Sequence, residues 1–317
     1  MNPIEQLSQR IREAWPKVKV STPTRPRDAH GVWWLDVDNS VANLSIQWHP
    51  ETGIGVSRTS SPSYGEGPER AFPTVDAAER RILQLLNPIY LAIDTPDRNQ
   101  ARDLIQAVDD FIGGIKIGLT FWFANDRSVV YDLVGDHDWF LDVKLYDIPV
   151  QVAGAIRAVI NLQPTFISLH TGEFKESANE DERRQEEMMM LMAKHAIEQQ
   201  AGILRVPQPR LLAVTVPTHL PASPAQVLAK AHRAISCGMD GVIASPLEVS
   251  VLRSELGTKP ILMTPGIRNG VTLDEQHRTG TAQQAVERGA NYLVIGRPIT
   301  EAADPREAAE RIRDSLR

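Results

Sequence analysis

Eight short apolar runs recur between residues 89 and 317, and this repetition constrains the fold more than any other feature of the chain. Runs of this length, bounded by polar stretches, are typical of strands buried on both faces. The stretches between them are mostly amphipathic, as expected of helices that join parallel strands. The predicted strands are residues 89–94, 114–118, 139–145, 166–170, 211–216, 240–245, 260–264 and 291–296. The predicted helices include residues 98–111, 150–161, 179–196, 224–237, 247–255, 281–288 and 305–316.

Eight strands that alternate with helices predict an α/β fold, a closed (β/α)8 barrel of the TIM type, as one domain over residues 89–317. In such barrels the reactive groups lie at the C-terminal ends of the strands. The rival arrangement, an open doubly wound sheet, needs a glycine-rich turn after its first strand. The segment AIDTPDR, which ends the first strand here, contains no glycine.

Residues 1–88 follow a different pattern and predict a small α+β domain, to which the sequence assigns no role. An amphipathic helix is expected near residues 4–15 and another at 75–86, with three short strands between them. Asp36 and Asp38 end the first of these strands. Without the further ligands of a calcium loop, the two acids indicate a turn rather than a metal site.

Composition excludes several classes of function. The formal net charge is -6 and no polybasic tract occurs, so neither nucleic acid nor an anionic membrane is an expected partner. Cys237 is the one cysteine, and we interpret it as a small buried residue. No run of 18 apolar residues and no signal-peptide pattern occurs, so we expect a cytoplasmic protein without a membrane span.

The third predicted barrel strand ends in a charged array, in which Asp142, Lys144 and Asp147 are spaced as Asp-x-Lys-x-x-Asp. Successive side chains of a strand alternate between its faces, so Asp142 and Lys144 are expected to project together. Burying either charge alone is costly. The strand is therefore expected to end at a polar cavity where each charge keeps the other ionised. The alternative is a solvated edge strand with a surface ion pair.

A phosphate site is expected on the same rim, beyond the seventh and eighth strands. Arg268 follows the seventh strand in TPGIR, and Gly296 and Arg297 follow the eighth in GRP. Phosphate sites in this fold commonly lie there. An arginine presents a planar fork to phosphate oxygens, and a glycine allows close approach of the backbone. Gln276, in the loop after the seventh strand, offers a neutral donor.

Five stretches of the barrel region, LAIDTPD, IKIG, FLDVKLYDIP, LLAVTVPT and TPGIR, resemble the orotidine 5'-phosphate decarboxylase family, and GRPIT matches near the end. The resemblance spans about residues 89–300. Related barrels that act on sugar phosphates share the Asp-x-Lys-x-x-Asp core but usually lack TPGIR. The resemblance implies decarboxylation of orotidine 5'-phosphate to uridine 5'-phosphate in de novo pyrimidine biosynthesis. It implies no metal and no organic cofactor.

The resemblance also implies roles for individual residues. Asp94 is expected to bind a ribose hydroxyl, and Lys116 to bridge the ribose and Asp142. Lys144 is expected to donate the proton to C6 of the pyrimidine. Asp147 is expected to reach the active site of a neighbouring subunit, which implies a homodimer with shared sites. The remaining substrate contacts are expected from Thr218 at the pyrimidine and from Arg268, Gln276, Gly296 and Arg297 toward the phosphate.

The chain departs from the family after DIP, where Val150 and Gln151 replace the usual Asn-Thr. Gln151 keeps the ability to form hydrogen bonds but is longer than the usual threonine. It is expected to contact the ribose of the substrate in the partner subunit's site. Two other functions remain open. One is a magnesium-dependent aldolase or decarboxylase acting on a sugar phosphate, which a chelator would inactivate. The other is a regulator that binds a uridine nucleotide without consuming orotidine 5'-phosphate.

Overall fold

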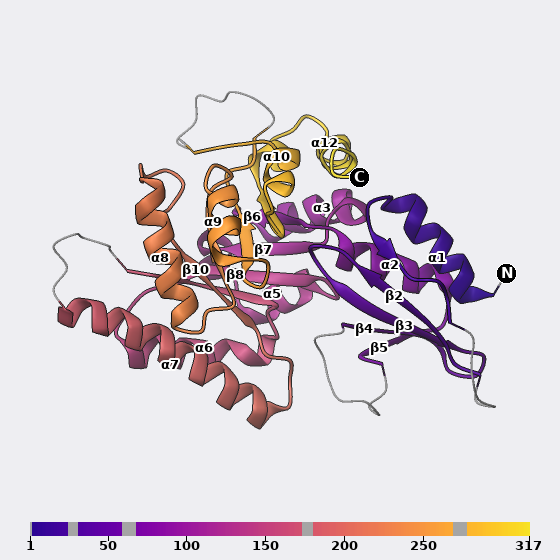
Figure 1. Cartoon of the computed structure of the whole chain (residues 1–317), viewed down its shortest axis with the longest axis horizontal. Helices are drawn as coiled ribbons and strands as arrows, with labels where there is room; N and C mark the ends of the chain where they lie inside the picture. Colours follow the sequence, from indigo (N-terminus) through magenta and orange to yellow (C-terminus); the bar gives the residue numbers. More distant parts are fainter. Residues whose placement is uncertain (1, 25–30, 59–67, 173–179, 269–277) are drawn as a thin grey trace.

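The computed structural model describes residues 2–24, 31–58, 68–172, 180–268 and 278–317. Two sheets make up the strand structure of these residues: a closed barrel of eight strands and an antiparallel sheet of five strands (Figure 1). In the described part of the chain, no helix is long and apolar enough to cross a membrane.

The barrel contains all eight predicted strands, which confirms the (β/α)8 prediction. Each strand pairs in parallel with the next in chain order, and β13 closes the barrel by pairing with β6. The strands are β6 (Ile89–Ile93), β7 (Gly114–Gly118), β8 (Asp138–Leu145), β9 (Phe166–His170), β10 (Arg210–Val214), β11 (Gly241–Ile243), β12 (Ile261–Thr264) and β13 (Tyr292–Ile295).

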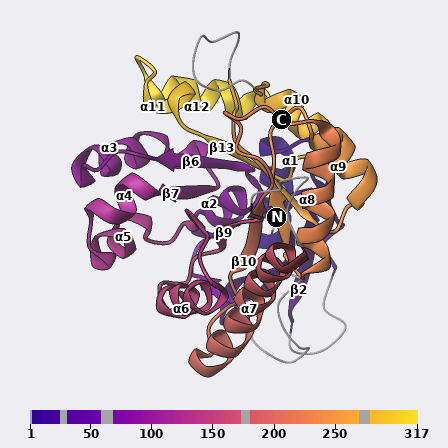
Figure 2. The ribbon, with the colours of Figure 1, turned by 90° about the vertical axis from the view of Figure 1, so that its left-hand side faces the viewer.

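Helices surround the barrel strands (Figure 2), and they include the seven that were predicted. Two of these helices begin with capping boxes, at Ser223 and Thr281. The sequence analysis missed α4, α5 and α11, of which α4 and α11 are only six and four residues long. The helices are α3 (Arg98–Val108), α4 (Leu119–Ala124), α5 (Arg127–Val134), α6 (Pro149–Val159), α7 (Glu180–Leu204), α8 (Pro224–Ser236), α9 (Val249–Leu256), α10 (Ala282–Glu287), α11 (Arg297–Thr300) and α12 (Pro305–Asp314), with short 3-10 turns η1 (Asp109–Phe111) and η2 (Ile160–Leu162).

Aromatic side chains fill the interior of the barrel near the N-terminal ends of its strands. Tyr90, Phe166 and Tyr292 meet edge to face, with ring centroids 5.1 to 5.7 Å apart, and Phe140 contacts Phe166 in the same way. Edge-to-face packing suits the charge distribution of aromatic rings. This end of the barrel is therefore a packed core, and an open site is expected only at the C-terminal end.

The N-terminal region is an antiparallel sheet covered by two helices. Alternate residues of its central strands are buried, as expected for a sheet with one face on a core. Two of its strands, β1 and β5, are only two and three residues long and were not predicted. The elements are α1 (Pro3–Ala14), β1 (Lys19–Val20), β2 (Trp33–Asp38), β3 (Asn43–His49), β4 (Gly53–Arg58), β5 (Arg70–Phe72) and α2 (Val75–Leu86).

The turn between β2 and β3 contacts the N-terminal end of the barrel. The hydroxyl of Tyr292 donates to the carbonyl of Val41 at 2.9 Å, and the amide of Asn291 donates to the carbonyl of Ser40. The Val41 side chain packs against the interior aromatic cluster. The N-terminal sheet therefore covers the barrel end opposite the expected active site.

An ion cluster joins the same two regions. Asp138, the first residue of β8, is bound by Arg58 at the end of β4 and by Arg81 of α2, the latter at 2.6 Å. Burial of the Asp138 carboxyl alone would raise its pKa, but the two guanidinium groups outweigh burial and hold that pKa below its ordinary value.

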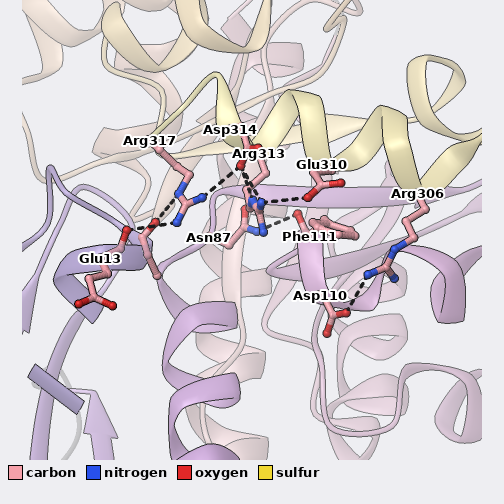
Figure 3. Close-up of polar contacts among 10 residues, drawn as sticks. Glu13, Asn87, Asp110, Phe111, Arg306, Glu310, Arg313, Asp314 and Arg317 are labelled. Atoms are coloured by element: carbon pink, nitrogen blue, oxygen red, sulfur yellow. Dashed lines mark hydrogen bonds and ion pairs between the residues drawn. The ribbon is translucent and has the colours of Figure 1, made fainter. Parts of the chain in front are cut away.

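The last helix and the residues that follow it also link the N-terminal region to the barrel (Figure 3). Arg317 donates to the carbonyl oxygens of Glu13 and Ala14 at the end of α1. The guanidinium groups of Arg306 and Arg313 each lie 4.8 Å from the ring centre of Phe111. One hydrophobic cluster extends through both regions, so the boundary at residues 88 and 89 stays a prediction.

Candidate active site

The C-terminal ends of three neighbouring strands gather the predicted charged residues. Asp94 directly follows β6, Lys116 lies in β7, and Asp142 and Lys144 lie in β8. Strand β7 pairs with both β6 and β8. Because the barrel strands are parallel, these four side chains come from one end of the barrel.

Asp142 and Lys144 form an ion pair at the end of β8. Nζ of Lys144 lies 2.8 Å from Oδ2 of Asp142, with 12% of the Asp142 side chain and 41% of the Lys144 side chain exposed. The strand does not alternate regularly here, because its register against β9 shifts between Leu141 and Leu145. Lys144 itself has a φ of 48°. Such a left-handed backbone costs a non-glycine residue about 1–3 kcal/mol and is frequent at functional sites.

Ser168 of β9 bonds to both partners of this ion pair. Its Oγ accepts the backbone N–H of Lys144 at 2.8 Å and donates to Oδ1 of Asp142 at 2.9 Å. The residue is completely buried. The sequence analysis missed Ser168, because the only signal was one small polar residue inside the apolar run FISLH.

Lys116 and Asp94 form a second ion pair on the neighbouring strands. Nζ of Lys116 lies 2.6 Å from Oδ1 of Asp94, with the amine almost buried and the carboxylate largely exposed. Gly118 makes room for this contact, since a Cβ there would lie 2.0 Å from the same oxygen. In the described ranges no ion pair joins Lys116 to Asp142. The expected bridge from Lys116 to the ribose and Asp142 therefore stays a prediction.

Asp147 and Gln151 lie at the same end of the barrel but outside these two ion pairs. Both are exposed, and Oδ1 of Asp147 accepts the backbone N–H of Ile148 at 2.6 Å. Among the hydrogen bonds of the described residues, none links either residue to Lys144. Their expected roles at a neighbouring subunit's site stay predictions.

The predicted phosphate residues that the structure describes follow the neighbouring strands β12 and β13. Arg268 is buried, and its backbone N–H donates to the carbonyl of Gly280 at 2.9 Å. Gly296 directly follows β13, and Arg297 is exposed at the start of α11. Gln276 lies outside the described residues. The structure thus brings two strand ends together at this rim, and the phosphate role stays a prediction.

A buried ion pair that the sequence analysis did not anticipate holds the loops of this rim. Nη1 of Arg278 lies 2.6 Å from Oε1 of Glu248, and both side chains are less than one tenth exposed. Arg278 also donates to two successive backbone carbonyls just before Thr218, at 2.9 and 3.0 Å. Thr218 is itself buried, and its methyl lies 3.7 Å from where a Cβ on Gly266 would be. The loops after β10, β11 and β12 are therefore linked.

His170 lies at the end of β9. Nδ1 of His170 accepts the backbone N–H of Gly172 at 3.0 Å, which is a structural contact at the end of β9. Within the ranges that the structure describes, no three His, Cys, Asp or Glu side chains are placed to hold a metal ion.

Comparison with known proteins connects this geometry with one family. The profile of the family described as orotidine 5'-phosphate decarboxylase / HUMPS matches residues 87–312. A curated orotidine 5'-phosphate decarboxylase of Rhodospirillum rubrum is 37% identical over 240 residues, which are 71% of this chain and 92% of the relative. Another, of Gluconobacter oxydans, is 36% identical over 72% of this chain and 96% of the relative.

A solved structure agrees with these sequence matches. The crystal structure of orotidine 5'-phosphate decarboxylase from Lactobacillus acidophilus superposes with a TM-score of 0.60 at 29% identity. The match covers 73% of this chain and 99% of that chain. The matched relatives are thus covered almost end to end, whereas the family profile begins only at residue 87 of this chain.

Proposed function

The chain belongs to the orotidine 5'-phosphate decarboxylase / HUMPS family, and from this premise we propose that it is an enzyme that decarboxylates orotidine 5'-phosphate to uridine 5'-phosphate in pyrimidine biosynthesis. The single observation that carries the proposal is the contact of Lys144 with Asp142 at the C-terminal end of the barrel. Matches to curated decarboxylases of 36–37% identity over most of their length support the same activity.

The chemistry requires a cation close to C6 of the pyrimidine. Loss of carbon dioxide leaves a carbanion in the plane of the ring, where the π system stabilises it poorly. The ammonium of Lys144 provides positive charge at that position and then transfers a proton to C6. Asp142 holds this ammonium 2.8 Å away, so the charge is in place before the bond breaks. The scheme uses neither a metal nor an organic cofactor.

The rest of the substrate is proposed to bind across the same end of the barrel. Asp94 and Lys116, already paired at 2.6 Å, present oxygen and ammonium groups to the ribose. Thr218 lies near the pyrimidine in this proposal. Binding energy from groups that do not react holds C6 against Lys144 and so contributes to the rate. The phosphate is assigned to the rim after the seventh and eighth barrel strands, with Arg268, Gln276, Gly296 and Arg297.

We further propose that two copies of the chain form a homodimer with shared active sites. Asp147 lies in a loop whose apolar side chains Tyr146, Ile148 and Val150 are each more than half exposed. Burying these side chains against a second copy would remove apolar surface from water. It would also place Asp147 and Gln151 beside a site other than that of their own chain.

The decisive experiment follows the ultraviolet absorbance of orotidine 5'-phosphate mixed with the purified protein, with and without a chelator. We expect turnover that the chelator does not change. Turnover abolished by the chelator would favour a magnesium-dependent sugar-phosphate enzyme. Tight binding of uridine 5'-phosphate without consumption of orotidine 5'-phosphate would instead support a nucleotide-binding regulator.

Lys144→Ala tests the role of the amine in the same assay. Removing the only proposed proton donor to C6 is expected to lower kcat by at least about 10⁴-fold, because both charge stabilisation and proton transfer are lost. Uridine 5'-phosphate should still bind, as measured by calorimetry, since Lys144 acts on the reacting carbon. Retention of substantial turnover in a folded Lys144→Ala variant would refute the assigned role.

A further inference from the structure

Ser168 lies opposite the irregular part of β8, where it forms two hydrogen bonds with the reactive ion pair. Between the paired positions Leu141–Ile167 and Leu145–Leu169, β8 contains three residues and β9 contains only Ser168. Because of the bulge, the β8 segment that includes Lys144 lacks the regular backbone hydrogen bonds to β9. The Ser168 hydroxyl takes the place of one backbone acceptor, because it accepts the N–H of Lys144 at 2.8 Å.

The second hydrogen bond of Ser168 fixes the carboxylate. Its hydroxyl donates a hydrogen bond to Oδ1 of Asp142 at 2.9 Å, while Oδ2 of the same carboxylate accepts a hydrogen bond from Nζ of Lys144 at 2.8 Å. Both oxygens of Asp142 are thus occupied, which restrains rotation of the carboxylate. A hydroxyl is suited to this position, since it accepts one hydrogen bond and donates another. An aliphatic side chain would do neither.

We propose that Ser168 is a positioning residue for the decarboxylation, one that holds both the backbone and the side-chain partner of Lys144. This inference rests on the proposed function. By accepting the N–H of Lys144, Ser168 supports the left-handed backbone at φ 48°. By donating to Asp142, it orients the group that binds the ammonium. Ser168 acts through these two residues and is not assigned a contact with the reacting atoms.

A purely structural serine would affect stability, whereas a positioning serine affects kcat more than substrate binding. Misplacement of a reacting group by about 1 Å can cost roughly 100-fold in rate. For Ser168→Ala we therefore expect kcat to fall by about 10–100-fold. The Kd for uridine 5'-phosphate should stay within about threefold, since contacts to the phosphate and ribose do not involve Ser168.

Two conservative variants extend the test. Ser168→Thr keeps a hydroxyl and is expected to restore kcat to within about threefold of the wild type. Ser168→Cys keeps the approximate volume but forms weaker hydrogen bonds, so its kcat should lie between those of the Thr and Ala variants. If the Ala variant does not fold, the order of the wild-type, Thr and Cys values of kcat decides the question.

Thr165→Val is the matched control. Thr165 also accepts a backbone N–H of β8, that of Trp139 at 3.3 Å, but at the opposite end of the same pair of strands. This variant is expected to change the unfolding temperature without changing kcat. All variants are assayed well below their unfolding temperatures, with kcat and nucleotide Kd measured separately.

The possible outcomes separate this inference from the function on which it rests. A wild-type protein that does not consume orotidine 5'-phosphate would remove the proposed function and this inference with it. A wild type that turns over, with Ser168→Ala and Ser168→Cys within twofold of its kcat, would overturn the role of Ser168 alone. An equal loss of kcat in Thr165→Val would likewise show that Ser168 contributes only general stability.

Discussion

Asp138 illustrates how one residue can combine a high desolvation cost with a structural role. Its carboxyl is largely buried, with 12% of the side chain exposed, and this burial disfavours the charged form. Arg58 and Arg81 nevertheless lower its pKa in the folded protein. A buried charge with good partners need not add net stability compared with an apolar residue. Removing the charge while leaving both arginines in place is different, because the guanidinium groups then lack their partner.

Asp138→Asn is expected to destabilise the protein by about 3–5 kcal/mol at pH 7. Because the folded pKa of Asp138 is depressed, its charge-dependent stability is present above the unfolded pKa of about 3.9 and is lost as pH falls through the lower folded value. The difference in unfolding free energy between wild type and variant should therefore shrink below about pH 4. Urea titrations at several pH values measure it.

Asp136→Asn provides the control for this pH dependence. Asp136 pairs with Arg70, but 80% of its side chain is exposed. Such pairs contribute about 0–1 kcal/mol. A similar loss of stability in both variants, or a difference at Asp138 that persists unchanged at low pH, would contradict the importance assigned to the buried cluster.

At the scale of elements, the turn between β2 and β3 is preorganised to contact the barrel. Oδ1 of Asn39 accepts the N–H groups of Val41 and Ala42 at 2.9 and 2.8 Å, and its amide donates to the carbonyl of Leu86 at 3.0 Å. These hydrogen bonds order the turn and attach it to the end of helix α2. The carbonyl of Val41 is then available to the hydroxyl of Tyr292 at 2.9 Å.

Tyr292→Phe removes this hydrogen bond while keeping the aromatic packing. We expect the free energy of unfolding to fall by about 1 kcal/mol. The loss is larger if no other donor reaches the carbonyl of Val41 in the variant. Tyr131→Phe changes an exposed tyrosine of α5 and should leave stability within about 0.5 kcal/mol of the wild type. Equilibrium unfolding in urea compares the two. Equal losses of unfolding free energy in the two variants would show that the hydrogen bond between the turn and the barrel does not contribute to stability.

At the scale of the whole molecule, the sequence predicts the barrel better than it predicts contacts within it. The eight strands are recognisable because each is an apolar run of its own, bounded by polar residues. The cluster of Asp138 with Arg58 and Arg81 could not be predicted. Asp138 lies 80 residues from Arg58 and 57 residues from Arg81 in the sequence, so no local pattern links them. The strands β1 and β5 are too short for a period-2 pattern and exist through pairing with their neighbours.

In the candidate site, too, the strand could be predicted from the sequence but the contacts between strands could not. The motif indicates that Asp142 and Lys144 lie on one strand, and regular alternation predicts that their side chains project together. The actual strand is bulged, Lys144 is left-handed, and Ser168 bridges the two residues across strands. No local pattern signals a bulge that depends on a partner strand. The homodimer, likewise, is implied by family resemblance and not by any pattern within the chain.

Shared active sites can be tested by complementation between two inactive variants. In the proposed dimer, each site combines Lys144 of one chain with Asp147 of the other. We therefore expect Lys144→Ala and Asp147→Ala homodimers each to be nearly inactive. A heterodimer of the two variants contains one site with both residues intact and one with neither, so it should regain about half of the wild-type activity.

Differently tagged copies of the two variants, coexpressed and purified through both tags, provide the heterodimer for this measurement. Coexpressed copies of Lys144→Ala alone, carrying the same two tags, are the control and should remain inactive. Recovery in the heterodimer is possible only if the two residues act across chains, because neither chain contains both. A heterodimer as inactive as its parents, full activity in Asp147→Ala alone, or failure of the two tags to copurify would each contradict shared sites.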